Sequence, residues 1–176
     1  MNEEVTVATA AEMHALGRRL AALLRAGDLV ILSGPLGAGK TTLTQGIGAG
    51  LGVRGPVTSP TFVIARVHPS LDRARGLAAS GPALVHADAY RLGSVLEMDD
   101  LDLDTDTATS VTVVEWGEGL AEGLAADRLE IAIIPTVLEG DDTVLEGDSP
   151  RTVVIAGVGE RWHGIQLPPA DLADRL

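Results

Sequence analysis

A glycine-rich segment in the first quarter of the chain has the residue types needed to bind a polyphosphate. Gly34 to Thr41 reads Gly-Pro-Leu-Gly-Ala-Gly-Lys-Thr and matches the P-loop (Walker A) pattern. Its glycines let backbone N–H groups face a phosphate, and a following helix adds partial positive charge at its N-terminus. Lys40 is the only lysine of the chain, and it would supply a compact charge that a wide Arg head cannot place in the same pocket. Thr41 would offer its hydroxyl to Mg²⁺.

Two acidic residues at the ends of apolar segments could complete such a site. Asp88 follows the segment that begins at Ala83, and Glu115 follows the segment that begins at Ser110. Because parallel strands end at one edge of a sheet, either carboxylate could bind Mg²⁺ or orient the attacking water. The sequence does not separate these two roles, and an acid at a strand end can also simply be solvated.

Hydroxyl and aromatic residues accompany these segments. Thr61, in the run Thr-Ser-Pro-Thr-Phe from Thr58, stands where nucleotide switches place a residue that senses the γ-phosphate, although an ordinary turn explains it as well. Three of the four aromatic residues fall in the candidate segments: Phe62, Tyr90 and Trp116. They would lie beside nucleotide-facing turns or fill the core at strand ends, whereas Trp162 is interpreted as a packing residue.

The hydrophobic pattern places these segments in an α/β fold. Helices are predicted at 9–25, 40–51 and 95–103, and strands at 28–33, 61–68, 83–89, 110–116, 128–135 and 151–158. Thr9 and Glu12 form a capping-box pattern at the first helix. We therefore predict a P-loop NTPase-like three-layer fold with a mostly parallel central sheet and antiparallel additions at one side. One domain is expected over residues 1–176, with a loosely packed tail from about residue 160.

Composition excludes several classes of function. The chain has 176 residues, of which 45% are hydrophobic, and a formal net charge of -12. So acidic a protein is not expected to bind nucleic acid strongly through its overall field. It has no Cys, its N-terminus is acidic rather than basic, and no segment approaches the about 20 apolar residues that span a bilayer. A cytoplasmic protein without a membrane role is expected.

Four motifs together resemble the bacterial YjeE/TsaE family over roughly Val5 to Val158. They are Gly-Pro-Leu-Gly-Ala-Gly-Lys-Thr-Thr-Leu from Gly34, Ser-Pro-Thr-Phe from Ser59, His-Ala-Asp-Ala-Tyr-Arg-Leu from His86 and Val-Glu-Trp-Gly-Glu from Val114. The resemblance implies a small ATPase of tRNA threonylcarbamoyladenosine biosynthesis, with ATP or ADP and Mg²⁺ as cofactors and low intrinsic turnover. It also implies two partners, the threonylcarbamoyl-transferase subunit and its pseudo-enzyme companion. The chain itself would not transfer the group to tRNA, and its acidity agrees with this.

The resemblance and the P-loop pattern together define the predicted site. The resemblance assigns the Mg²⁺ ligands to Thr41 and Glu115, the switch threonine to Thr61 and the second strand-end acid to Asp88. Catalytic roles are predicted for Lys40, Thr61, Asp88 and Glu115. Nucleotide binding is predicted for Thr9, Leu36, Gly37, Ala38, Gly39, Lys40, Thr41, Thr42, Trp116 and Arg151. Segments 69–82 and 139–148 are longer than the family usually has, which concerns partner contacts more than the nucleotide site.

Two other functions remain compatible with the sequence. In a small-molecule kinase, Arg66, Arg73 and Arg75 could form a lid that closes on phosphates. A non-catalytic switch would bind ATP to template assembly without turning it over. A GTPase is disfavoured because guanine is usually read by an Asn-Lys-x-Asp segment, and the only lysine already stands in the P-loop.

Overall fold

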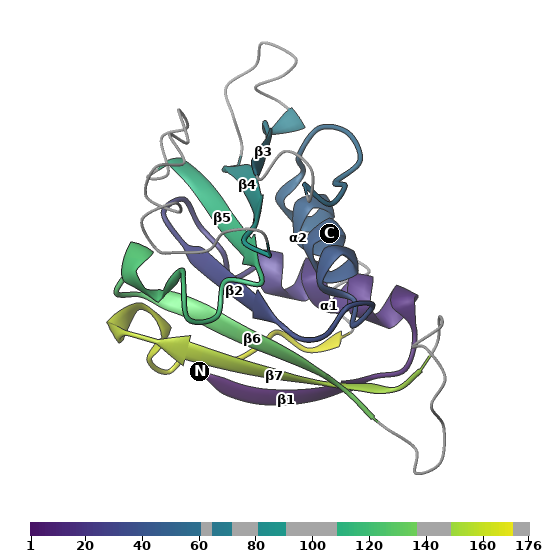
Figure 1. Ribbon diagram of the computed structural model, residues 1–176. Helices are drawn as coiled ribbons and strands as arrows, with labels where there is room; N and C mark the ends of the chain where they lie inside the picture. Colours follow the sequence, from purple (N-terminus) through teal and green to yellow (C-terminus); the bar gives the residue numbers. More distant parts are fainter. Residues whose placement is uncertain (61–64, 72–80, 91–108, 137–148, 171–176) are drawn as a thin grey trace.

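The computed structural model describes residues 1–60, 65–71, 81–90, 109–136 and 149–170 (Figure 1). Its strands are β1 (Asn2–Val7), β2 (Leu29–Ser33), β3 (Ala65–His68), β4 (Ala83–Asp88), β5 (Ser110–Glu115), β6 (Arg128–Pro135) and β7 (Arg151–Val158). Its helices are α1 (Ala10–Ala21), α2 (Lys40–Leu51) and the short 3₁₀ helices η2 (Glu122–Leu124) and η3 (Glu160–Trp162). None of the helices in these ranges is long and apolar enough to cross a membrane.

The seven strands form one mixed sheet in the order β1-β7-β6-β2-β5-β4-β3. The middle strands β6, β2, β5 and β4 run parallel, which confirms the predicted α/β fold with a mostly parallel centre. Antiparallel strands flank this centre on both sides, with β7 and β1 at one edge and β3 at the other. The predicted antiparallel additions at one side are β7 and β1, and β3 is a further antiparallel strand at the opposite edge, paired with β4.

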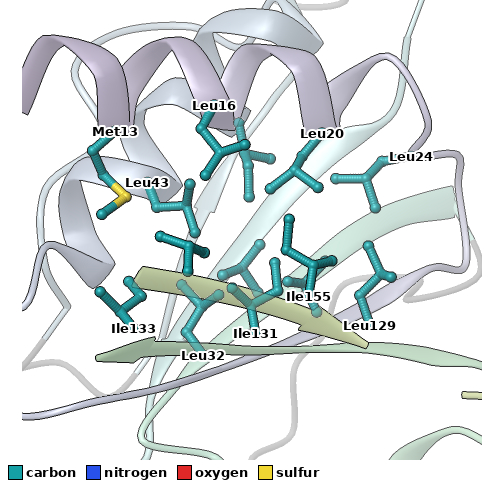
Figure 2. Close-up of a cluster of buried hydrophobic side chains, with 14 of the residues drawn as sticks. Met13, Leu16, Leu20, Leu24, Leu32, Leu43, Leu129, Ile131, Ile133 and Ile155 are labelled. Carbon is teal, nitrogen blue, oxygen red and sulfur yellow. The ribbon is translucent and has the colours of Figure 1, made fainter. Parts of the chain in front are cut away.

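Apolar side chains alternate between the two faces of the sheet. Val30 and Leu32 of β2 belong to the large core under α1 and α2, whereas Leu29 and Ile31 belong to a smaller cluster with Ala121 on the other face. Figure 2 shows the large core, where Leu residues of α1 lie over Leu and Ile residues of β2, β6 and β7. Both α-helices therefore cover one face, and the segment around η2 forms a thinner layer on the other.

The first helix begins at the predicted cap and ends earlier than expected. The Thr9 hydroxyl accepts a hydrogen bond from the Glu12 backbone N–H at 3.1 Å, and the Glu12 carboxylate accepts from the Ala8 N–H at 2.7 Å. The helix ends at Ala21 rather than at Arg25. Helix α2 has the predicted bounds, whereas the helix predicted at 95–103 lies outside the described residues.

The described part of the C-terminal tail packs against the core. Trp162 is fully buried in the large apolar cluster, as its interpretation as a packing residue requires. Its carbonyl accepts a hydrogen bond from the Met1 ammonium at 2.8 Å, and Arg19 Nε donates to the Pro168 carbonyl at 2.7 Å. The loosely packed tail that we expected is therefore anchored at least as far as Pro168.

Small residues bring α1 and α2 into backbone contact. A Cβ atom on Gly46 of α2 would lie 2.1 Å from the His14 carbonyl oxygen, and one on Gly17 of α1 would lie 2.4 Å from the Leu43 carbonyl oxygen. Real Cβ atoms do not come this close to backbone, so only glycine permits this helix–helix distance. The contact fixes the helix that follows the P-loop against α1.

We expect Gly46→Ala to destabilise the protein by about 2 kcal/mol, because overpacking against backbone exceeds the gain in helix propensity. Urea unfolding monitored by circular dichroism measures this. Gly123→Ala is the matched control, since Gly123 is exposed and a Cβ there meets nothing within 4 Å. Equal unfolding midpoints for the two variants would contradict the close packing.

Candidate functional site

The predicted site residues meet at the carboxyl edge of the parallel strands. The P-loop joins the end of β2 to the start of α2. Glu115 at the end of β5 is the register partner of Leu32 in β2 on one side and of Asp88 in β4 on the other. The order of the strands therefore brings both acids beside the loop.

Three glycines give the P-loop its shape. Gly34, Gly37 and Gly39 have positive φ angles of 137°, 77° and 107°, in the region that side chains disfavour. A Cβ atom on Gly34 would lie 2.6 Å from the Ile133 carbonyl oxygen. Gly39 is the N-cap residue of α2. The loop backbone can therefore approach a phosphate closely, next to the N-terminus of a helix.

A hollow of about 240 Å³ opens between the loop and the two acids. Its lining is Leu36, Gly37, Gly39, Lys40, Thr41, Thr42, Ser59, Asp88, Glu115 and Trp116. All of these except Ser59 are predicted site residues. Ser59 stands in the hydroxyl-rich run that the sequence indicates, where Thr61 was preferred, and Thr61 itself lies outside the described residues. Ala38 is fully buried and belongs to the large core.

Thr9 and Arg151 do not line this hollow. The Thr9 hydroxyl caps α1, and that helix approaches the loop through Met13, whose Cε would lie 3.3 Å from a Cβ on Gly39. Arg151 is buried at the start of β7, opposite Val7 and Pro135. Both residues therefore lie at the same edge of the sheet as the P-loop without reaching the hollow itself.

Lys40 contacts the loop's own carbonyl groups. Its Nζ atom donates to the Gly34 oxygen at 2.7 Å and to the Pro35 oxygen at 2.8 Å, and lies 3.7 Å from the centre of the Trp116 ring. Only 5% of Lys40 is exposed. Burial lowers the pKa of its ammonium group, and the negative charges of Glu115 and Asp88 oppose this shift. The cation is thus fixed at the floor of the site.

Trp116 adopts a backbone conformation that is rare for a large side chain. Its φ angle is 60°, in the left-handed region. Its N–H donates to the Leu32 carbonyl at 2.9 Å, and its ring lies 5.1 Å from that of Tyr90 at an interplanar angle of 54°. This turn directs the indole ring over Lys40, and such strained conformations gather at functional sites.

The Glu115 carboxylate is fixed by two side chains. The Thr41 hydroxyl donates to its Oε1 at 2.9 Å and approaches Oε2 at 3.2 Å, and His86 Nε2 lies 2.7 Å from Oε1. Glu115 is only 3% exposed and His86 is fully buried. Sequence reasoning assigned no role to His86. A histidine inside an apolar strand, two residues before Asp88 and therefore on the same face, was the signal available.

The residues present could hold Mg²⁺ together with a ligand that supplies further oxygen atoms. Within the described ranges, no three His, Cys, Asp or Glu side chains gather to hold a metal alone. The Thr41 hydroxyl and Glu115 carboxylate are neighbouring hard oxygen donors. Mg²⁺ prefers oxygen, keeps several waters and commonly takes one or two protein ligands beside substrate phosphates.

The predicted kinase lid gains no support from the described residues. Arg66 is exposed on β3 and donates to the Thr58 hydroxyl at 2.5 Å, and it does not line the hollow. Arg73 and Arg75 lie outside the described residues.

Comparison with known proteins adds a family to this geometry. The family model "Threonylcarbamoyl adenosine biosynthesis protein TsaE" matches residues 7–140. A Streptomyces coelicolor protein, named "tRNA threonylcarbamoyladenosine biosynthesis protein TsaE", is 62% identical over 85% of this chain and 93% of its own length. A Bacillus subtilis protein of the same name is 35% identical over 86% and 84% of the two chains. The crystal structure of Bacillus subtilis YdiB superposes with a TM-score of 0.67, at 28% identity, covering 99% of this chain and 95% of YdiB.

Replacing Lys40 by Met should stabilise the protein by about 1 kcal/mol near pH 8, a rise of about 2–4 °C in Tm, because a desolvated charge is removed. Because the pKa of Lys40 is lowered in the folded protein, the unfolded chain binds more protons than the folded protein at pH values between this lowered pKa and the ordinary value of 10.5. The parent therefore gains stability as the pH rises through this interval, and the advantage of the variant disappears.

Thermal unfolding between pH 8 and 10.5 measures this effect, with Arg54→Met as a control for loss of an exposed cation. A Lys40→Met protein that is less stable than the parent at every pH would show that the carbonyl and indole contacts outweigh desolvation.

Proposed function

The chain belongs to the TsaE family, and from this premise we propose that it is an ATP-binding, Mg²⁺-dependent ATPase of tRNA threonylcarbamoyladenosine biosynthesis. One arrangement supports the proposal most directly. A glycine loop, the only lysine of the chain and the Thr41–Glu115 pair surround one hollow. This combination suits a triphosphate with its metal. The expected activity is weak, slow hydrolysis of ATP.

Lys40 would bind the β- and γ-phosphate oxygens in exchange for the Gly34 and Pro35 carbonyls. Its ammonium group is already desolvated, so the attraction to a polyphosphate is stronger than it would be in water. Backbone N–H groups of Gly37 to Thr42 would contact the same phosphates. Mg²⁺, when bound, would neutralise the charge that develops on the transferred phosphoryl group.

The two acids would have different roles. Glu115 contacts Thr41 directly, so we propose that these two residues are the protein ligands of Mg²⁺. Asp88 lies beside Glu115 in the neighbouring strand and also lines the hollow, and its Oδ1 accepts from the Tyr90 N–H at 2.9 Å. We assign to Asp88 the orientation of the attacking water.

The threonylcarbamoyl-transferase subunit and its pseudo-enzyme companion are the proposed partners. ATP hydrolysis would support turnover of the modification complex in the cytoplasm. The net charge of -12 opposes strong direct binding of tRNA by this chain, so the partners would contact the tRNA.

We expect Asp88→Asn to lower ATP turnover in the presence of the partner subunits by about 100-fold while nucleotide affinity changes little. Glu115→Ala should lower turnover and also raise the Mg²⁺ concentration that turnover requires. Release of phosphate measures the turnover of both variants.

Glu118→Ala is the control, because this exposed acid follows in the same turn but lies outside the hollow. Unchanged Mg²⁺-dependent hydrolysis in Glu115→Ala would refute its assignment. Binding without turnover in the parent would indicate a nucleotide switch instead.

Adding ATP or ADP should change the tryptophan fluorescence of the parent protein, because Lys40 would move away from the Trp116 ring as it meets phosphate. The change should be absent in Trp116→Phe, which keeps only the fully buried Trp162. Calorimetry on the same variant checks that nucleotide still binds. A full fluorescence response in Trp116→Phe would place the nucleotide away from this indole.

A further inference from the structure

We propose that His86 is a positioning residue, whose Nε2–H orients the Glu115 carboxylate toward the Thr41 hydroxyl. The two atoms His86 Nε2 and Glu115 Oε1 lie 2.7 Å apart. The inference rests on the proposed function, because it concerns the Mg²⁺ that Thr41 and Glu115 would bind.

The pairing of β4 with β5 sets this contact. Leu84 of β4 and Val113 of β5 both lie in the core beneath α2. Side chains two residues apart in a strand share a face, so His86 and Glu115 point to the same side. Glu115 stands in register with Asp88, yet its carboxylate reaches back along the neighbouring strand to His86.

The donor in this contact is the imidazole. A carboxylate has only acceptor oxygens, so Nε2 carries the hydrogen. The other ring nitrogen, Nδ1, is buried and has no hydrogen-bond partner among the described residues. A fully buried ring with one nitrogen unsatisfied costs stability that an aliphatic side chain would not cost. Its contact with Glu115 is the physical reason for a histidine here.

The contact restricts the directions that the Glu115 carboxylate can take. Asp88 occupies the adjacent register position, and two neighbouring carboxylates repel each other. The His86 hydrogen bond fixes one oxygen, which leaves the group facing Thr41. Partners that orient a metal-binding carboxylate in this way commonly change metal affinity by about 10- to 100-fold.

A variant at His68 is the control that distinguishes this role of His86 from a general effect of burying an imidazole. His68 is 5% exposed, and its Nε2 atom also lacks a hydrogen-bond partner among the described residues. It lies on β3, the strand next to β4, opposite Leu84. No hydrogen bond joins it to Glu115, so His68→Leu is a matched control.

The test is calorimetry of a non-hydrolysable ATP analogue, first in EDTA and then across a titration of Mg²⁺. We expect the parent, His86→Leu, His86→Gln and His68→Leu to bind the analogue alike in EDTA. In His86→Leu, the Mg²⁺ concentration that gives half of the gain in affinity should rise about 10- to 100-fold. His86→Gln should recover much of this loss, since its amide can donate to the carboxylate, and His68→Leu should match the parent.

The outcomes distinguish the inference from the proposed function. If the parent does not bind the analogue at any Mg²⁺ concentration, the proposed function falls and the role of His86 falls with it. If the parent shows Mg²⁺-dependent binding and His86→Leu has the same Mg²⁺ requirement, only the inference is overturned. It is also overturned if His86→Leu weakens binding equally in EDTA, or if His68→Leu raises the Mg²⁺ requirement as much.

Discussion

A buried carboxylate needs hydrogen-bond donors, and the organisation of this site follows from that requirement at Glu115. Glu115 is only 3% exposed, and an unpaired charge at such a position would cost about 3–5 kcal/mol. Thr41 and His86 satisfy it from two different elements, the first turn of α2 and the middle of β4. The contact therefore joins the P-loop helix to two parallel strands, and these elements must assemble before the site exists.

The apolar core makes this concentration of charge possible. Lys40, Asp88 and Glu115 are all buried at one edge of the sheet, where removing charged groups from water costs free energy. The large cluster of Leu, Ile and Val residues beneath α1 and α2 stabilises the fold in spite of this cost (Figure 2). Backbone contact between the two helices at Gly17 and Gly46 then fixes the position of α2, and with it the position of the P-loop.

The local sequence determined those features that depend on near neighbours. The glycine spacing of the loop, the cap at Thr9 and the bounds of α2 were all predictable, because turns, caps and helices are set by residues within about four positions of each other. Strand-end positions for Asp88 and Glu115 followed from short apolar runs in the same way. The family resemblance added candidate partners and chemistry, which no local pattern contains.

Only the tertiary structure decided what contacts what across the sheet. Strand β1 escaped prediction because its first three residues are all polar, which leaves too short an apolar pattern to indicate a strand, and its partner β7 lies almost at the other end of the chain. The role of His86 became visible only when β5 placed Glu115 beside it. The positions of Thr9 and Arg151 outside the hollow likewise follow from strand order. Pairing between distant segments depends on packing of the whole core, and the hydrophobic period of one segment does not specify its partner.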